Sequence, residues 1–209
     1  FRSVLVVGSG PAGLAAALAA AKTGGRVILC DEGAELGGSL LWQGGARIDG
    51  LEPAAWAAAA LKELAGNPRV RLLPRTTAFG YFPHNLIGLS ERLTDHLENP
   101  PAAGARERLW QVRAAKVILA TGAIEQPLVF PGNDRPGIML AGAALQYLKR
   151  YAVLPGRRIV IATICDSAYA TALELQAAGA QIEHFIDLRS VEHSPALAKL
   201  QTAGIKAWG

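Results

Sequence analysis

Short apolar runs alternate with alanine-rich segments over the first 120 residues of the chain. Four runs of mostly apolar residues have the length and composition of strands that are buried on both faces: 4–7, 26–30, 70–73 and 116–119. The alanine-rich segments 11–22 and 53–65 both begin at a proline and are followed shortly by glycine, which predicts helices. This order of elements predicts an α/β fold with a parallel sheet.

A different pattern interrupts this order. Polar and apolar residues alternate in three stretches, which predicts three antiparallel strands: 78–82, 86–92 and 108–113. The α/β order then returns as helix, strand, helix and strand: 140–151, 158–162, 167–178 and 182–186. We therefore predict a first domain over residues 1–150 and part of a second over 155–209. Another strand begins at 207–209, and we expect the chain to be a piece of a longer polypeptide.

The first predicted strand ends at a glycine-rich turn, Gly8-Ser9-Gly10-Pro11-Ala12-Gly13, which opens the first helix. Gly8 permits a sharp turn, Gly10 lets the backbone approach a pyrophosphate, and Gly13 lets the helix pack close to the strand. The helix N-terminus adds unpaired N–H groups and a partial positive charge. Because strand, turn and helix follow in this order, the motif predicts a dinucleotide site.

An acidic pair, Asp31-Glu32, follows the second predicted strand. Asp31 lies roughly 20 residues beyond the turn, where a carboxylate accepts hydrogen bonds from a dinucleotide ribose. With an acid here and no neighbouring arginine, a 2′-phosphate is disfavoured, so FAD or NAD is preferred over NADP. The motif by itself leaves FAD and NAD open, and a turn that binds nothing is the remaining alternative.

Two later segments extend the pattern. Gly37-Gly38 lies in a loop that enters a predicted helix, and in flavoproteins with two dinucleotide domains such a pair passes close to the cofactor. The strand 116–119 ends on Ala120-Thr121-Gly122. This ending, after a three-stranded meander and a glycine-rich turn, is typical of glutathione-reductase-like flavoproteins. We predict a two-dinucleotide-binding-domain flavoprotein fold: a Rossmann-type domain with a β-meander, and part of a degenerate second nucleotide domain.

The second predicted unit departs from the glycine pattern. Its turn, residues 162–168, contains no glycine, and Ile164 or Cys165 would place a side chain where a pyrophosphate must touch the backbone. We therefore predict a nucleotide fold with poor or no dinucleotide affinity. Asp187, at the tip of the second strand, is expected to be a solvated strand end, with a ribose acceptor as the alternative.

Composition excludes several classes of function. The chain has 209 residues, of which 51% are apolar, and its net charge of +4 is scattered, so we expect neither a nucleic-acid nor a membrane partner. Its two cysteines form no Cys-x-x-Cys motif, which fits a cytoplasmic protein. No apolar span reaches the roughly 18 residues of a membrane helix. The histidines, His193 among them, are scattered, and we predict no metal site and identify no catalytic residue.

These motifs closely resemble the α subunit of heterotetrameric sarcosine oxidase. The resemblance extends over essentially all 209 residues, with related α subunits in opine oxidases and hydrogen cyanide synthase. It rests on the glycine-rich turn, Asp31-Glu32 and a set of further segments: Leu36-Gly37-Gly38-Ser39-Leu40, Pro74-Arg75-Thr76-Thr77-Ala78-Phe79-Gly80-Tyr81, Ala120-Thr121-Gly122-Ala123-Ile124-Glu125, Asn133-Asp134-Arg135-Pro136-Gly137, Leu140-Ala141-Gly142-Ala143 and Asp166-Ser167-Ala168-Tyr169.

The resemblance implies a redox-inert NAD⁺ in the first unit, with FAD as the alternative there. It implies FAD on a β-type flavoprotein subunit, with FMN at the interface between the subunits. The residues implied or predicted to contact the cofactor are Gly8, Gly10, Pro11, Ala12 and Gly13 at the pyrophosphate, Asp31 and Glu32 at the ribose, Gly38 and Ser39 near the phosphates, Ala78 at the adenine edge, and Thr121 and Gly122 after the last strand.

For the whole complex, the resemblance implies oxidation of sarcosine to glycine. The one-carbon unit passes to tetrahydrofolate, and the electrons pass to O₂ and form H₂O₂. The present segment would bind a nucleotide and organise subunits, and alone it would be inactive. The alternatives are a stand-alone FAD-dependent NAD(P)H oxidoreductase, a component of an opine oxidase or of hydrogen cyanide synthase, and a structural subunit with an empty site.

Overall fold

The structure is a computed structural model that describes residues 3–44, 47–189 and 196–209. The chain divides into two compact units, which are described separately. The first comprises Phe1–Leu41 with Gly45–Ala123, and the second comprises Trp42–Gly44 with Ile124–Gly209.

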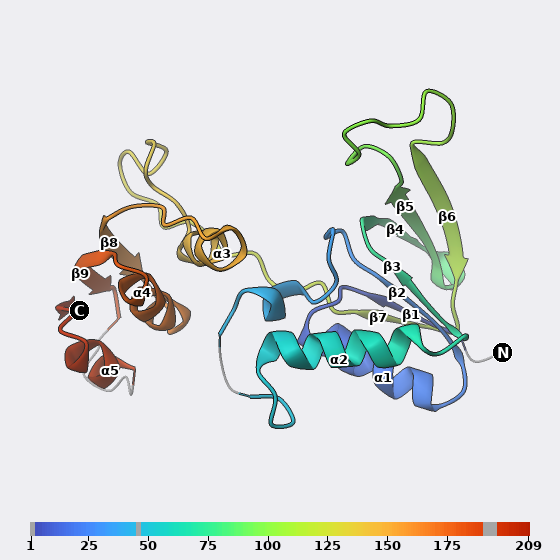
Figure 1. Cartoon of the computed structure of the whole chain (residues 1–209), viewed down its shortest axis with the longest axis horizontal. Coiled ribbons are helices and arrows are strands. Elements are labelled where there is room, and N and C mark those ends of the chain that lie inside the picture. The colour runs from blue at the N-terminus through green and yellow to red at the C-terminus, as the bar shows by residue number, and fades with distance from the viewer. Residues whose placement is uncertain (1–2, 45–46, 190–195) are drawn as a thin grey trace. The chain divides into compact units, whose positions relative to one another are not determined.

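A four-stranded parallel sheet forms the centre of the first unit (Figure 1). Its spatial order is β3-β2-β1-β7, and its strands are β1 (Ser3–Val7), β2 (Arg26–Cys30), β3 (Val70–Leu73) and β7 (Lys116–Leu119). All four are short apolar runs, and each matches its sequence prediction to within one residue. Strand β1 lies between β2 and β7. The chain therefore continues from β1 to β2 on one side, and it later returns to pair β7 with β1 on the other side.

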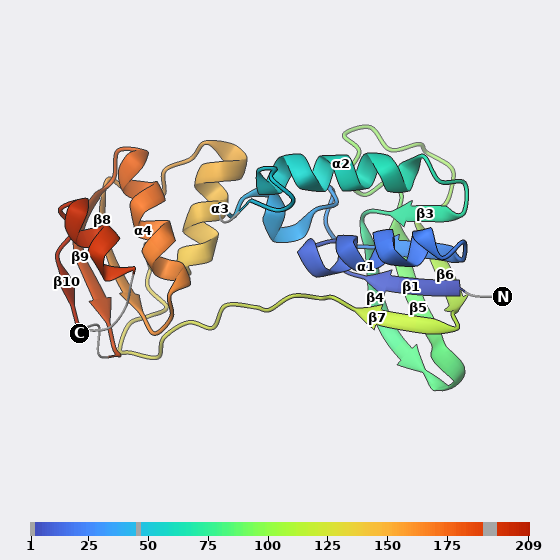
Figure 2. The same cartoon turned by 90° about the horizontal axis from the view of Figure 1, so that it is seen from below.

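The two faces of this sheet carry different layers (Figure 2). Val6 and Leu29 pack with the buried alanines and leucines of α1 (Pro11–Lys22) and α2 (Pro53–Ala65). Leu5 and Val7, which alternate with Val6 along β1, pack against the antiparallel sheet β4-β5-β6 on the opposite face. The period-two alternation of side chains along a strand therefore divides the unit into two cores.

The antiparallel sheet consists of β4 (Thr76–Phe82), β5 (Leu86–Arg92) and β6 (Glu107–Arg113). A register shift between Ala78 and Gly80 interrupts the pairing of β4 with β5. The meander predicted from alternating residues is present with these three strands. The helix expected after Gly37-Gly38 is limited to a short 3-10 segment, η1 (Gly38–Leu41).

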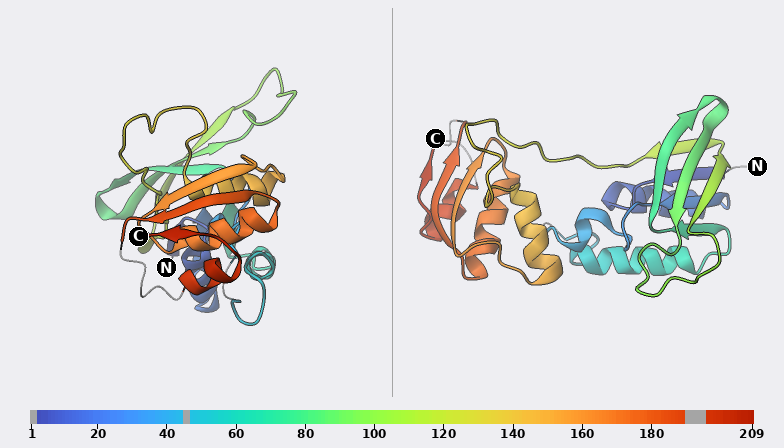
Figure 3. Two further views of the ribbon diagram at one scale, coloured as in Figure 1. Left: turned by 90° about the vertical axis from the view of Figure 1, so that its left-hand side faces the viewer. Right: turned by 90° about the horizontal axis from the view of Figure 1, so that it is seen from above.

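The second unit contains a three-stranded parallel sheet of order β10-β9-β8 (Figure 3). Its elements are α3 (Ala141–Tyr151), β8 (Arg158–Thr163), α4 (Ser167–Ala177), β9 (Gln181–Asp187), α5 (Leu197–Thr202) and β10 (Ala207–Trp208). The core centres on Tyr169 and Phe185, whose ring centroids lie 4.5 Å apart.

The division into units differs from the predicted domain limits, 1–150 and 155–209. Helix α3 contributes the buried Ala144 to the core that contains Tyr169 and Phe185, so it packs as part of the second unit. The six-residue α5 was not expected, because so short a helix carries little periodic signal in a sequence. The domain limits themselves stay a prediction.

Candidate dinucleotide site

The predicted cofactor loops of the first unit lie at the carboxyl ends of three adjacent strands. The Gly8 amide donates to the carbonyl oxygen of Cys30 (2.8 Å), which links the ends of β1 and β2. The Ala120 amide donates to the carbonyl oxygen of Val7 (2.8 Å), which links the ends of β1 and β7. In open α/β sheets, ligands bind at the carboxyl ends of the strands, at the point where the strand order reverses. In this sheet the order reverses at β1, because β2 and β3 lie on one side of it and β7 lies on the other.

Two glycines of the turn are required by packing, and one is not. A Cβ on Gly8 would lie 2.2 Å from the carbonyl oxygen of Ala120, and one on Gly13 would lie 1.9 Å from that of Gly8. Gly8 also has a φ of +98°, a conformation that favours glycine. A Cβ on Gly10, by contrast, would meet nothing within 4 Å. The protein leaves this side of the Gly10 main chain open, as the close approach of a pyrophosphate requires.

The start of α1 is suited to an anion. Gly10 is its N-cap, no side chain caps it, and its first turn contains no acidic residue. Pro11 occupies the first position, and both Pro11 and Ala12 are exposed. The first-turn amides without an intrahelical hydrogen-bond acceptor, and the partial positive charge of the helix end, are therefore available to phosphate groups.

The second glycine loop packs directly on this turn. A Cβ on Gly38 would lie 2.9 Å from the Cα of Gly10, and the Gly37 amide donates to Ser9 Oγ (2.9 Å). Ser39 follows, half-buried, in η1. The structure thus brings the loops predicted to surround the phosphates into contact.

The two acidic residues have different surroundings. Asp31 Oδ2 accepts hydrogen bonds from the amide and the hydroxyl of Ser9, both at 2.7 Å, and Asp31 Oδ1 accepts one from the Gly33 amide at 2.8 Å. The Glu32 side chain is exposed, and its carbonyl oxygen accepts from Arg92 Nη2 at 2.7 Å. The expectation of no neighbouring arginine is wrong, since β5 brings Arg92 to the tip of β2.

The remaining predicted contacts are at the periphery of the site. The Thr76 amide donates to the carbonyl oxygen of Asp31 (2.7 Å), which fixes the start of β4 and places the half-buried Ala78 two residues further on. Thr121 and Gly122 follow β7, where both are exposed and Gly122 has a φ of +74°. Ser9 was missed by sequence reasoning, because it occupies a variable position of the glycine motif.

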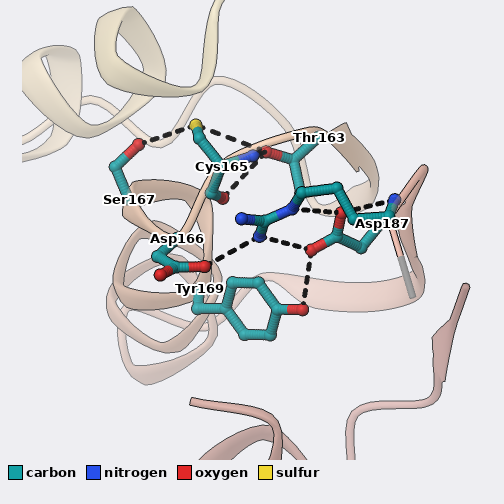
Figure 4. Close-up of polar contacts among 7 residues, drawn as sticks. Thr163, Cys165, Asp166, Ser167, Tyr169 and Asp187 are labelled. Atoms are coloured by element: carbon teal, nitrogen blue, oxygen red, sulfur yellow. Dashed lines mark hydrogen bonds and ion pairs between the residues drawn. The ribbon is translucent and has the colours of Figure 1, made fainter. Parts of the chain in front are cut away.

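The corresponding turn of the second unit is filled by side chains (Figure 4). Thr163 Oγ1 accepts from the Cys165 amide (3.0 Å), and Cys165 Sγ lies 3.1 Å from Ser167 Oγ. Its hydrogen bond with Ser167 lowers the pKa of the exposed Cys165 thiol. Asp166 is the N-cap of α4, so a carboxylate stands where the first unit presents the bare backbone of Gly10.

Asp187 is not the solvated strand end that the sequence predicts, since it is only 2% exposed. Its Oδ2 accepts from the Tyr169 hydroxyl (2.9 Å) and from Arg189 Nη2 (2.7 Å), and its Oδ1 accepts from Arg189 Nε (3.0 Å). Arg189 Nη2 also donates to Asp166 Oδ1 (2.7 Å). The hydrogen bonds from the Arg189 guanidinium are the main cause that lowers the pKa of Asp187 to about 2.

Two further findings concern the described residues alone. They contain no group of three or more His, Cys, Asp or Glu side chains placed to hold a metal ion, and His193 lies outside them. None of their helices has the length and apolar composition that crossing a membrane requires.

Comparison with known proteins agrees with the fold. Residues 3–104 match the family described as FAD dependent oxidoreductase. L-proline dehydrogenase from P. horikoshii is similar in structure, with a TM-score of 0.70 and 24% identity over 89% of this chain and 35% of that one. Thioredoxin reductase from T. acidophilum gives a TM-score of 0.67 at 16% identity, over 99% of this chain and 64% of that one. The predicted fold class, an α/β fold of the two-dinucleotide-domain type, is thereby confirmed.

The sequence is similar, more particularly, to sarcosine oxidase α subunits. It is 50% identical to that of Corynebacterium sp. (strain P-1) over 204 residues, which are 97% of this chain and 21% of the relative. It is 50% identical to that of Rhizobium meliloti (strain 1021) over 186 residues, 89% of this chain and 19% of the relative. An opine oxidase component of Agrobacterium tumefaciens (strain Ach5) is 31% identical over 86% of this chain and 35% of the relative. The predicted resemblance is confirmed, and the chain spans about a fifth of the length of the sarcosine oxidase subunits it matches.

Proposed function

We propose that the first unit binds a dinucleotide at the end of β1, and that this dinucleotide is NAD⁺, with FAD as the alternative. The observation that carries the proposal is the contrast among the glycines of the turn. Side chains at Gly8 and Gly13 would collide with the backbone, whereas one at Gly10 would project into open space beside the uncapped start of α1. That space fits a pyrophosphate bridge, which NAD⁺ and FAD share.

In this proposal, the residues of the site bind and orient the dinucleotide. The turn from Gly8 to Gly13, including Pro11 and Ala12, holds the pyrophosphate together with Gly38 and Ser39. The acidic pair is assigned to the adenosine ribose, Ala78 to the adenine edge, and Thr121 and Gly122 to the rim beyond β7. NAD⁺ held here would have a structural role, and we assign no catalytic residue to this chain.

The second unit, in the same proposal, binds no dinucleotide. Its turn offers side chains instead of glycine backbone, and Asp166 places a negative charge at the start of α4. The Arg189 guanidinium already engages the carboxylates of both Asp166 and Asp187. A ribose or a phosphate would have to displace these ion pairs.

We propose that the parent protein is an α subunit of the sarcosine oxidase type in a cytoplasmic heterotetramer. The support is 50% identity over nearly the whole chain to two sarcosine oxidase α subunits. The complex would convert sarcosine, tetrahydrofolate and O₂ to glycine, methylenetetrahydrofolate and H₂O₂, with FAD and FMN outside the site described here. A β-type flavoprotein subunit would be a direct partner.

The test is to denature the purified chain, identify any released nucleotide by mass spectrometry, and titrate the nucleotide-free chain with NAD⁺ and FAD. We expect NAD⁺ to bind, and Gly10→Val to abolish binding without lowering the melting temperature of the free chain. Cys165→Val, which places the same valine side chain in the second turn, should leave the affinity unchanged. FAD with its absorption near 450 nm would replace NAD⁺ as the ligand, and no binding of either would refute the proposal. NADH oxidation by the chain alone would favour the stand-alone reductase.

A further inference from the structure

The antiparallel sheet β4-β5-β6 has two faces with different surroundings. Ile87 and Leu89 of β5 are buried in the core that this sheet shares with the parallel sheet. Because side chains alternate along a strand, Leu86, Gly88 and Ser90 lie on the opposite face, which we call the outer face. Helices α1 and α2 pack on the far side of the parallel sheet, so neither of them covers the outer face.

The outer face carries apolar residues where a solvated sheet face usually carries polar ones. Strand pairing places Phe82 beside Leu86, and Leu109 beside Ser90. Directly paired residues of antiparallel strands share a face, so Phe82 and Leu109 belong to the outer face, where they are 47% and 64% exposed. Antiparallel sheets with one solvated face alternate between apolar residues inside and polar residues outside. The outer face departs from this alternation.

Two phenylalanine rings cover the glycines of this face. A Cβ on Gly88 would lie 2.5 Å from Phe79 Cζ, and one on Gly80 would lie 2.6 Å from Phe82 Cζ. Aromatic rings shield strand glycines in this way, because glycine has no side chain to pack. Shielding accounts for only one side of each ring, since Phe79 stays 58% exposed and Phe82 47%. The rings are therefore held against the sheet with an apolar surface turned outward.

We propose that the outer face is an interface within the parent polypeptide. Its apolar centre, which we call the outer patch, consists of Phe79, Phe82, Leu86 and Leu109, and it packs against a part of that polypeptide outside the present 209 residues. Contiguous exposed apolar patches are uncommon on soluble proteins and mark surfaces that another element covers. The proposal rests on the proposed parent protein, and not on the proposed ligand of the first unit.

The lengths of the relatives favour the same polypeptide as the occupant of the outer patch. Most of each sarcosine oxidase α subunit that the chain matches lies outside the matched region. A segment tethered to the same chain by a short flexible linker has an effective concentration in the millimolar range. A tethered segment therefore reaches the outer patch ahead of another subunit or a second copy.

The border of the outer patch indicates the chemistry of the segment that fits it. Gln111 pairs with Gly88, and Arg113 pairs with Leu86, so both side chains lie on the outer face, where they are exposed. An apolar centre with a polar border is the usual composition of a protein interface. We expect the covering segment to present apolar side chains to the rings and an acceptor, such as a carboxylate, to Arg113.

The test is a labelling experiment at two matched leucine positions. Leu109→Cys places a thiol in the outer patch, and Leu51→Cys places one at an exposed leucine of the first unit outside the patch. Both variants are made in the 209-residue chain and in the full-length parent polypeptide, which is studied alone and in its assembled complex. Iodoacetamide labelling is followed by peptide mass spectrometry without added nucleotide. The readout is the labelling rate at residue 109 divided by that at residue 51.

We expect this ratio to fall about tenfold or more between the chain and the parent polypeptide alone, because burial removes the thiol from the reagent. It should fall no further in the complex. Leu109→Gln provides a second measurement. It should leave the melting temperature of the chain unchanged, as exposed substitutions usually do, and lower that of the parent polypeptide. Leu51→Gln is the matched control and should change neither melting temperature.

Other results would overturn the proposal. A ratio that stays the same in every form means that the outer face is open to solvent. A ratio that falls only in the complex assigns the face to another subunit. A ratio that is already low in the chain assigns it to the chain itself or, if the ratio rises on dilution, to a second copy. The titrations with NAD⁺ and FAD test the ligand separately, so failure of one proposal is distinguishable from failure of the other.

Discussion

Asp187 is the buried charge on which the turn of the second unit depends. Replacing it with asparagine would keep the shape of the side chain but remove the negative charge that Arg189 engages. The amide of asparagine would also turn one acceptor into a donor that faces the Tyr169 hydroxyl or the guanidinium. We predict that Asp187→Asn destabilises the second unit at neutral pH.

The magnitude follows from the pKa of this carboxyl. Folding lowers the pKa of Asp187 from 3.8 to about 2, chiefly through the hydrogen bonds from Arg189. Such a difference corresponds to about 2 kcal/mol at neutral pH. Because the Arg189 side chain is 42% exposed, water screens the pair, and we expect about 1–2 kcal/mol.

The pH dependence has a definite sign. A carboxyl whose pKa is lower in the folded state contributes its full stabilisation above the unfolded pKa of 3.8, and the contribution disappears as the pH falls through about 2. The free-energy difference between wild type and Asp187→Asn should therefore be constant above pH 5 and narrow between about pH 4 and 2.

Hydrogen exchange followed by mass spectrometry measures this effect locally. Peptides from β8 and β9 report opening of the second unit, and the rates are corrected for intrinsic exchange at each pH. Glu183→Gln is the matched control, because Glu183 lies on the same strand and pairs with Arg158 at 2.6 Å, an arginine whose side chain is 74% exposed. The reasoning is refuted if the two variants lose equal protection at pH 7, or if the gap between Asp187→Asn and wild type persists at pH 2.

Three further predictions concern single positions. Gly13→Ala should lower the stability of the first unit by about 1–3 kcal/mol in thermal unfolding, because its Cβ would lie 1.9 Å from a carbonyl oxygen. Gly10→Ala should have no such effect, and equal melting temperatures of the two variants would contradict the prediction. Iodoacetamide should modify Cys165 well before Cys30, because Cys165 is exposed and its pKa is lowered, whereas Cys30 is buried and its pKa is raised to about 12. Faster labelling of Cys30 in a mass-spectrometric time course would contradict this prediction. Ala152→Gly should raise stability to urea by about 0.5–1 kcal/mol, because Ala152 ends α3 with a φ of +54°; a lower urea midpoint would argue against strain there.

The strands and most helices were predictable because their signals are local. Apolar runs gave β1, β2, β3 and β7 to within a residue, and Pro53 with Gly66 gave both ends of α2. The prediction that Gly37-Gly38 lies in a loop close to the glycine-rich turn is correct, but the prediction that a helix follows this loop is wrong. The loop continues into a 3-10 segment of four residues that ends at Leu41. Nothing in the local pattern distinguishes so short a segment from the start of a helix.

The partners of the acidic residues were not predictable, for a physical reason. Arg92 follows Glu32 by 60 positions, and only the packing of the meander on the sheet brings the two together. Arg189 is two residues from Asp187, yet nothing in the sequence shows that its side chain turns back over the strand end. The hydrogen-bond partners of a side chain depend on which loops the tertiary fold brings together. The helices and strands, by contrast, can be predicted from the spacing of residues along the chain.

The two turns, taken together, show what the glycine motif does and does not specify. Both units place a turn and a helix start after a parallel strand, and both have an acid at the tip of the next strand. In the first unit, backbone amides and a hydroxyl satisfy that acid, so the cationic end of the helix stays uncovered. In the second unit, a guanidinium satisfies it and brings a second carboxylate to the helix start. The chemical identity of the donors that satisfy the acid, and not the presence of the acid, therefore decides whether such a turn is left open to an anionic ligand.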